Sequence, residues 1–231
     1  MPHPSGRPWI VAHRGASRVE RGNTIAAFTA AAPLGADAVE LDVRRTADGV
    51  LVVHHDALIG GVPIVDMSRD RVATVAPHVP DLADGLEVCG GMWVNVEVKN
   101  DPADPDWDPD ATVAARVADL LAGRRDIVIS SFDQASVEIS VAAGMRSGLI
   151  LDHGANPLEA LSTVDGIEML FAPITSMRDG AAAPVVAAGQ EAGIEIGVWW
   201  TDDPDEMQRL AAAGVGLVFT NVPDVALAAM S

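Results

Sequence analysis

Ionisable side chains gather at the ends of short apolar runs in this chain of 231 residues. Alternation along a β-strand would place Glu40 and Asp42 on one face, and Glu97 and Lys99 likewise. Burying such charges without partners is costly, so a shared chemical site is the simplest reason for the pattern. The full set of candidates is His13, Arg14, Glu40, Asp42, His55, Glu97 and Lys99.

Glu40, Asp42 and Glu97 together offer only oxygen ligands. Hard divalent cations prefer oxygen, whereas zinc sites in proteins draw on nitrogen and sulfur. The sequence therefore predicts a site for a divalent cation, Mg²⁺ or Ca²⁺ with Mn²⁺ as a third option. A structural role for these acids, in salt bridges near a strand end, is the alternative interpretation.

Arg14 and Lys99 beside such a cation would form an electropositive pocket that suits a phosphate diester. Lys99 is the single lysine of the chain, against 14 arginines, which argues against a general role in solubility. His13 and His55 could then act as general acid and base, because the pKa of histidine lies near neutrality.

The charge of the chain excludes several function classes. Its 15 basic and 33 acidic residues give a net charge of −18, which disfavours nucleic acid and anionic lipid surfaces as partners. One cysteine excludes a disulfide framework. The N-terminus lacks the apolar run of a signal peptide, and no segment has the ~20 apolar residues of a membrane span. We expect a soluble cytoplasmic protein without stable membrane association; its oligomeric state is not predicted.

Short apolar runs alternate with alanine-rich segments along the whole chain, which predicts parallel strands joined by helices. The predicted strands are Trp9–Ala12, Ala38–Val43, Trp93–Val98, Ile127–Ser131, Gly148–Leu151, Met169–Ala172, Ile194–Trp199 and Leu217–Thr220. The predicted helices include Thr24–Ala32, Ala111–Leu121, Ala135–Ala142, Pro184–Ala192 and Asp205–Ala213. Eight such strands favour a (β/α)₈ TIM barrel in a single domain, residues 1–231. An open doubly wound sheet is the competitor, but its G-x-G-x-x-G fingerprint is absent.

The segment after the second strand departs from this repeat. Leu51–His54 is predicted to form a hairpin with Ala38–Val43 across the turn Ala47-Asp48-Gly49. Asp56–Gly91 then forms a small insertion before the third barrel strand. In a TIM barrel, function collects at the C-terminal strand ends, where the candidate residues lie.

Several motifs of the chain, taken in order, resemble the glycerophosphodiester phosphodiesterase family. They are His13-Arg14-Gly15-Ala16-Ser17, Asn23-Thr24, Val39-Glu40-Leu41-Asp42-Val43, Val53-His54-His55-Asp56, Val96-Glu97-Val98-Lys99, Val198-Trp199 and Phe219-Thr220-Asn221. The similarity spans most of the chain and implies a (β/α)₈ barrel.

The resemblance further implies metal-dependent hydrolysis of small glycerophosphodiesters to glycerol 3-phosphate and an alcohol, a step in lipid and glycerol metabolism. The substrate's own glycerol hydroxyl would attack phosphorus and give a cyclic phosphate that water then opens. By residue, the resemblance assigns the cation to Glu40, Asp42 and Glu97, the acid–base pair to His13 and His55, and phosphate contacts to Arg14 and Lys99. Trp199 is expected to line the site, with Trp200 on the opposite face of its strand.

One departure from the family pattern bears on this expectation. Gly22 stands before Asn23-Thr24, where a glutamate is usual. This departure supports one alternative, a phosphodiester-binding protein impaired in catalysis. Two further alternatives stay open on other grounds: a lysophospholipase D-type phosphodiesterase with the same chemistry, and a Schiff-base aldolase that uses Lys99.

Overall fold

The computed structural model describes residues 3–231, and its strands close into a barrel. Within these residues, eight parallel strands follow the order β1-β11-β10-β9-β8-β7-β6-β2, and β1 pairs with β2 to close the ring. Their bounds are β1 Trp9–Ala12, β2 Ala38–Arg45, β6 Trp93–Val98, β7 Ile127–Ser131, β8 Arg146–Ile150, β9 Met169–Pro173, β10 Glu195–Trp199 and β11 Leu217–Thr220. The predicted TIM barrel is confirmed, and four strands have the predicted bounds.

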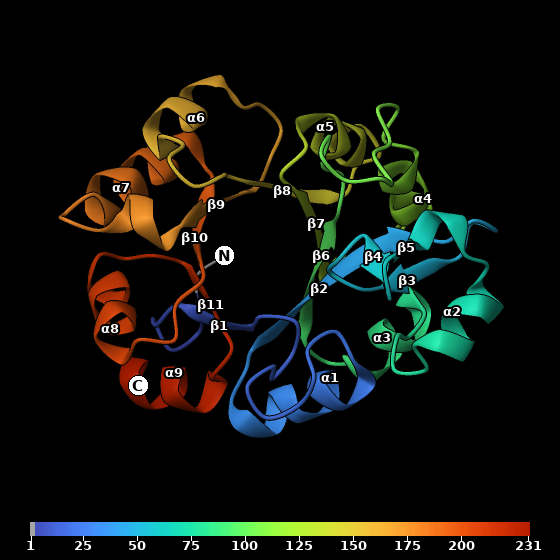
Figure 1. The fold of residues 1–231 in the computed structure, drawn as a ribbon. Coiled ribbons are helices and arrows are strands. Elements are labelled where there is room, and N and C mark those ends of the chain that lie inside the picture. The colour runs from blue at the N-terminus through green and yellow to red at the C-terminus, as the bar shows by residue number, and fades with distance from the viewer. Residues whose placement is uncertain (1–2) are drawn as a thin grey trace.

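Helices surround the barrel (Figure 1). They are α1 Ile25–Ala31, α3 Leu82–Val88, α4 Thr112–Leu120, α5 Gln134–Ala142, α6 Pro157–Thr163, α7 Ala182–Ala192, α8 Pro204–Ala212 and α9 Pro223–Met230. Side chains cap several of them: the Asp133 carboxylate, for example, accepts the backbone N–H of Ser136 at the start of α5. In the part of the chain described, no helix has the length and apolar composition needed to cross a membrane.

The insertion after β2 contains more regular structure than its sequence reveals. It comprises β3 Leu51–Val53, β4 Leu58–Ile59, β5 Val62–Pro63, the 3₁₀ turn Ile64–Asp66, α2 Arg69–Val75 and the helix α3. Two other 3₁₀ turns lie outside it, Ala32–Leu34 after α1 and Ile174–Met177 after β9. The predicted hairpin is confirmed, because β3 runs antiparallel to the end of β2 with Val53 opposite Val43. A small apolar cluster around Val52, Ile64 and Val72 holds the insertion together.

The barrel interior is filled by large side chains, which leave room for chemistry only at one end. Phe171 and Phe219 pack edge to face at 5.1 Å in this interior. Gly148 and Gly197 flank Phe171, and a Cβ at either position would lie 2.6 Å from its ring. Glycine is therefore required on both neighbouring strands to admit this ring.

Strand register brings the predicted acids together. In the β2–β6 pair, Asp42 lies opposite Glu97, and Glu40 lies opposite Asn95. All four side chains occupy alternate positions of their strands and so face the barrel interior. The parallel direction places them near the C-terminal strand ends.

Candidate active site

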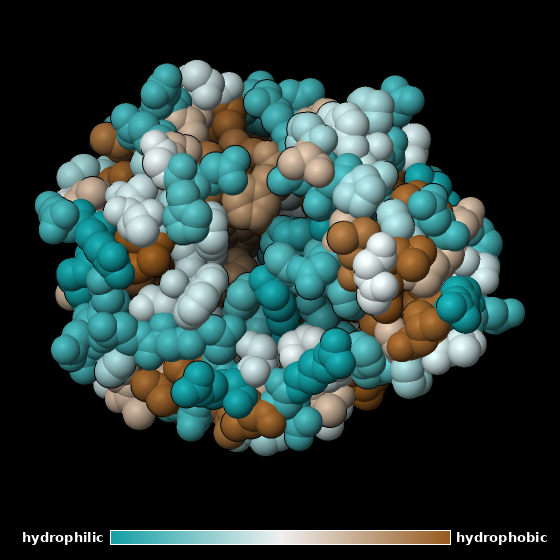
Figure 2. Space-filling model, in the orientation of Figure 1, coloured by the Kyte–Doolittle hydropathy of each residue, from teal (hydrophilic) through white to brown (hydrophobic). Residues whose placement is uncertain are grey.

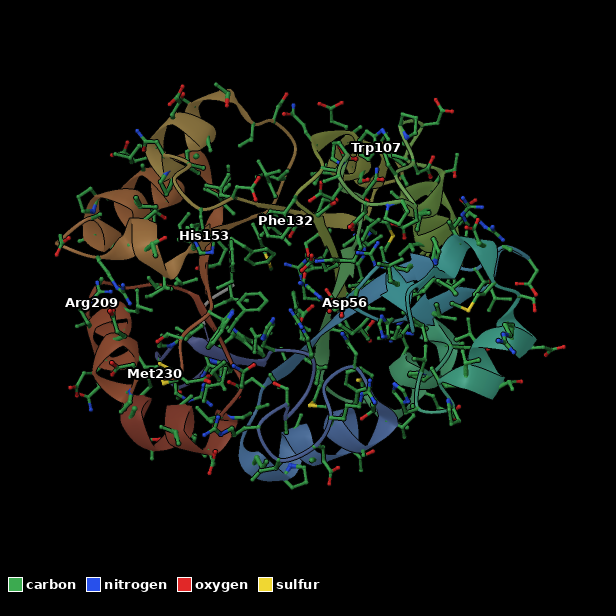
Figure 3. All side chains as sticks on the ribbon, in the orientation of Figure 1. Asp56, Trp107, Phe132, His153, Arg209 and Met230 are labelled. Carbon is green, nitrogen blue, oxygen red and sulfur yellow. The ribbon has the colours of Figure 1, made fainter. Side chains whose placement is uncertain are left out.

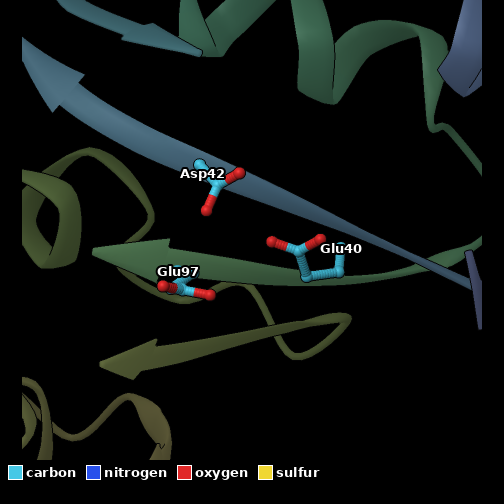
Figure 4. Close-up of side chains that lie close together, drawn as sticks. All are labelled: Glu40, Asp42 and Glu97. Carbon is cyan, nitrogen blue, oxygen red and sulfur yellow. The ribbon is translucent and has the colours of Figure 1, made fainter. Parts of the chain in front are cut away.

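Three carboxylates from two adjacent strands converge in the barrel. Glu40 and Asp42 extend from β2 and Glu97 from β6 (Figure 4). Each offers an oxygen within 4.8 Å of the others, and the three residues are 2%, 1% and 9% exposed. The convergence expected from strand alternation is thus present in the fold.

The electrostatics of this cluster favour a cation. Burial, with the neighbouring Asp42 and Glu97 carboxylates, raises the pKa of Glu40 well above its usual value. Burial also raises the pKa of Glu97, although Lys99 opposes the shift. Burial acts in the same direction on Asp42, but Lys99 and Arg14 outweigh it and lower the pKa of that carboxyl. The three carboxylates of the cluster therefore carry more negative charge than the neighbouring Arg14 and Lys99 neutralise.

Polar atoms without hydrogen-bond partners beside the three carboxylates indicate whether a metal ion fits there. Within residues 3–231, the buried Oε1 atom of Glu40 has no hydrogen-bond partner, and neither does either polar atom of the Asn95 amide. Carboxylate and amide oxygens are the ligands preferred by Mg²⁺, Ca²⁺ and Mn²⁺. The residues present thus fit a hard divalent cation.

A tight turn after β1 brings Arg14 against the cluster. Arg14 and Asn23 have left-handed backbone, with φ of 59° and 60°. The backbone N–H of Arg14 donates to Glu40 Oε2 at 2.7 Å, and Arg14 Nε lies 3.4 Å from Asp42 Oδ2. Asn23 Nδ2 donates to the same Asp42 oxygen at 2.6 Å. Gly15 permits the turn, because a Cβ there would meet the Ala27 backbone at 2.6 Å.

Lys99 is the second cation beside the three carboxylates. Its Nζ lies 2.6 Å from Glu97 Oε1 and 3.5 Å from Asp42 Oδ1. Burial works against the charged form, but these two carboxylates prevail and raise the pKa of Lys99. A Schiff base requires a neutral amine, so the ion pairs argue against the aldolase alternative.

His13 is oriented by a chain of hydrogen bonds from the last strand. Asn221 Nδ2 donates to Asp202 Oδ2, which leaves Asn221 Oδ1 to accept from His13 Nδ1 at 2.9 Å. The proton of the neutral ring therefore lies on Nδ1, and Nε2 remains available as an acceptor. Burial and the nearby Arg14 lower the pKa of His13 to about 4, which keeps the ring neutral at pH 7.

His55 is held differently. Its Nδ1 lies 2.7 Å from Asp56 Oδ1, so the carboxylate accepts the ring proton there too. Burial lowers the pKa of His55, while the Asp42 and Asp56 carboxylates oppose that shift. Both imidazoles therefore keep Nε2 for the substrate. The partner of Nδ1 is a neutral amide oxygen for His13 and a carboxylate for His55.

Arg44, which the sequence did not single out, fixes the backbone beside His55. Its Nε donates to the carbonyl of His55 at 2.8 Å, and its buried guanidinium binds Asp104 and Asp106. The aspartate-rich loop 101–110 is therefore anchored to β2 by this single arginine.

A small cavity of about 100 Å³ joins these groups. It contacts His13, Arg14 and Lys99 on its polar side, and its apolar wall consists of Phe132, Ile150, Phe171, Trp199 and Phe219. Figure 2 shows the hollow at the centre of this face, and Figure 3 shows Asp56 and Phe132 beside it.

The tryptophan pair requires a correction. Trp199 lines the cavity as expected and packs on the Phe132 ring at 5.4 Å. Trp200 also lines it and stacks on His13 at 5.9 Å, so its expected placement on the opposite face is wrong. The alternation rule fails because β10 ends at Trp199, and Trp200 already belongs to the following loop.

Sequence reasoning assigned no role to several residues that the site uses. Asn95 carried a usable signal, since it lies two positions before Glu97 on the same strand face. Asn221 lay within a recognised motif but had no assigned contact. Arg44 had no local signal, because its partners lie about 60 residues further along the chain.

Comparisons with known proteins agree with this geometry. A model of the glycerophosphoryl diester phosphodiesterase family matches residues 13–225. A glycerophosphodiester phosphodiesterase of Caldanaerobacter subterraneus is 26% identical over 240 residues, covering 93% of this chain and 94% of that protein.

Solved structures show the same likeness. A glycerophosphodiester phosphodiesterase from Thermotoga maritima superimposes with a TM-score of 0.82 at 25% identity, covering 96% of this chain and 97% of the other. One from Agrobacterium tumefaciens gives a TM-score of 0.77 at 28% identity, with 96% and 99% covered.

Proposed function

Since this chain belongs to the glycerophosphoryl diester phosphodiesterase family, we propose that it hydrolyses glycerophosphodiesters to glycerol 3-phosphate and an alcohol. The observation that carries the proposal is the buried convergence of three carboxylates beside two histidines and two cations. In this proposal residues 1–231 act as one catalytic domain.

The cation would be held by Glu40, Asp42 and Glu97, with Mg²⁺, Ca²⁺ and Mn²⁺ as the candidates. When bound, it supplies positive charge that stabilises negative charge on phosphoryl oxygens. Arg14 and Lys99 contact the phosphate from the same side. Their ion pairs with the acids pre-orient both cations, so little reorganisation accompanies charge development in the transition state.

Proton transfer is assigned to the two histidines. His13 is neutral at pH 7, because its pKa is lowered to about 4, and its Nε2 can accept the proton of the attacking glycerol hydroxyl. His55 is the proposed proton donor to the leaving alkoxide, and its hydrogen bond to the Asp56 carboxylate favours the protonated ring against the effect of burial. The attack closes a cyclic phosphate; water then opens it, with the two histidines in exchanged roles.

Trp199 is proposed to line the glycerol side of the site. Its Nε1 donates to the carbonyl of Leu151 at 3.2 Å, which leaves the ring faces for packing. Together with Phe132 it offers an apolar wall to the carbon skeleton of the substrate.

The cyclic intermediate can be tested with a matched pair of substrates. Glycerophosphoglycerol should be hydrolysed, and an analogue that lacks the hydroxyl adjacent to the phosphate ester on both glycerol halves should not be, because it has no internal nucleophile. Equal hydrolysis of both would contradict the internal attack. Choline release from lysophosphatidylcholine without glycerol 3-phosphate release from any glycerophosphodiester would favour the lysophospholipase D alternative instead.

A further inference from the structure

A second cavity, of about 490 Å³, opens from the central one. Its walls include Arg14, Arg18 and Arg21, and four of the six histidines of the chain. The carboxylates on the wall are Asp56 and Asp202. We call this the basic cavity, and its concentration of cations stands out in a chain of net charge −18.

The two carboxylates do not compensate the arginines. Asp56 accepts from His55, and Asp202 accepts from Asn221. Within residues 3–231, the exposed guanidinium groups of Arg18 and Arg21 have neither a carboxylate nor another hydrogen-bond acceptor as partner. Both arginines are therefore available to a ligand.

His78 adds an unused donor or acceptor to the same wall. In the described chain its buried Nε2 has no hydrogen-bond partner. Burial, Arg21 and His54 lower the pKa of His78. The carboxylates of Glu20 and Asp84 line a neighbouring cavity on the other side of Arg21 and His78. His54 already donates from Nδ1 to the carbonyl of Asp56, so an anion placed here would meet the guanidinium donors of Arg21, which the protein itself leaves unpaired.

A third cavity, which shares His55, Glu97 and Lys99 with the central one, has the reverse charge. An acidic cavity of about 640 Å³ is lined by six carboxylates, including Asp101, Asp133 and Asp152. Its two cations are already engaged, Arg44 by Asp104 and Asp106, and Lys99 by Glu97. The molecule thus offers two openings of opposite electrostatic character to the two ends of a substrate.

The position of the two histidines indicates which of these cavities binds the alcohol half of the substrate. A leaving oxygen must lie within reach of the general acid. Both His13 and His55 line the basic cavity, whereas only His55 lines the acidic one. The alcohol half in the basic cavity therefore has its oxygen near both imidazoles, whichever acts as acid.

We propose that the basic cavity is a subsite for the alcohol half of the substrate and that it selects alcohols bearing a further phosphate group. This inference rests on the proposed phosphodiesterase function and names the substrate class for the same site. Arg18, Arg21 and His78 would be its specificity-determining residues. A cationic alcohol half, such as choline, would be disfavoured by the same charges.

The test compares glycerophosphoglycerol with a derivative that carries a phosphate monoester on its distal hydroxyl. We expect kcat/KM for the phosphorylated substrate to exceed that for glycerophosphoglycerol by about 10-fold or more, with glycerophosphocholine lowest, since the added phosphate gains charge-assisted hydrogen bonds from the arginines. The ratio of phosphorylated to neutral substrate should fall toward one in Arg18→Gln and Arg21→Gln.

Arg125→Gln is the matched control. Arg125 is exposed and precedes β7, at the opposite end of the barrel, so this variant changes net charge equally without touching the basic cavity. Its ratio should equal that of the wild type. An unchanged ratio in the Arg18 and Arg21 variants, or a wild-type preference for glycerophosphocholine, would overturn the inference while leaving the proposed function intact.

Failure of the proposed function has a different signature, namely no hydrolysis of any of the three substrates. Calorimetric binding of the same substrates to His13→Ala then still decides the inference. Tighter binding of the phosphorylated compound, lost on adding Arg21→Gln, supports the subsite, and equal binding of the neutral compound rejects it.

Discussion

Glu97 joins the acidic cluster to Lys99, and stabilisation by added metal reports its role as a metal ligand. Glu97→Gln keeps the shape of the side chain but removes the charge. We expect affinity for Mg²⁺, Ca²⁺ or Mn²⁺ to fall by at least about 100-fold, because loss of even an outer hydrogen-bond partner costs about 10–100-fold.

The readout is the rise in melting temperature when each cation is titrated into protein stripped of metal. Glu138→Gln is the control, since Glu138 lies exposed on α5. The control should keep the full rise. An equal rise in Glu97→Gln and wild type would remove Glu97 from the ligand set.

His13 should also make the stability of the metal-free protein depend on pH. Its pKa is lowered from 6.5 to about 4 in the folded chain, so the unfolded chain binds more protons between these values. Stability from this group is therefore present above pH 6.5 and is lost as pH falls toward 4, by about 2 kcal/mol between pH 7 and pH 5.

Denaturant unfolding of wild type and His13→Gln at both pH values isolates this effect. The difference between their free energies of unfolding should change by that amount in the direction that disfavours the wild type at pH 5. A difference independent of pH would mean that His13 titrates normally.

At the scale of elements, Arg44 anchors loop 101–110 to β2. Arg44→Met would leave Asp106 without its partner, although that side chain is only 7% exposed. Breaking a buried ion pair in this way costs about 3–5 kcal/mol. The activity should fall as well, because the carbonyl of His55 loses its donor.

Asp104→Asn provides the comparison for this variant. Asp104 is 32% exposed, and a pair at the surface is worth about 1 kcal/mol or less. Urea unfolding should therefore separate the two variants clearly. Similar losses in both would show that the loop is not anchored through the buried Asp106 contact.

The elements that the sequence predicts best are those with a local signal. Trp93–Val98 and Ile127–Ser131 have the predicted bounds because apolar residues fill most of their positions, as in strands buried on both faces. The polar residues Asn95 and Glu97 of the first strand alternate with them. The helices of the insertion, α2 and α3, were not predicted, since a mixed polar segment has no clear period. Trp200 was misplaced for a related reason: the end of a strand is set by its neighbours and not by its own residues.

The candidate site was predictable wherever a strand face carried it. Glu40, Asp42, Glu97 and Lys99 follow strand alternation, and the fold brings them together. The hydrogen bonds that orient His13 join residues about 200 positions apart. Such contacts depend on the pairing of β1 with β11, which no short motif encodes.

For the whole molecule, a chain of net negative charge carries one basic cavity beside the barrel mouth. The net charge of −18 repels anions in general, and the cations around the barrel mouth reverse that field locally. The fold thereby confines phosphate recognition to the end of the barrel where both histidines lie.

The most direct test of the account is release of glycerol 3-phosphate from glycerophosphoglycerol by metal-stripped protein, before and after Mg²⁺, Ca²⁺ or Mn²⁺ is restored, in wild type and His13→Ala. We predict release by the wild type only with a cation, and none by His13→Ala even though it still binds the cation. Equal release without any cation, or wild-type rates in His13→Ala, would contradict the account.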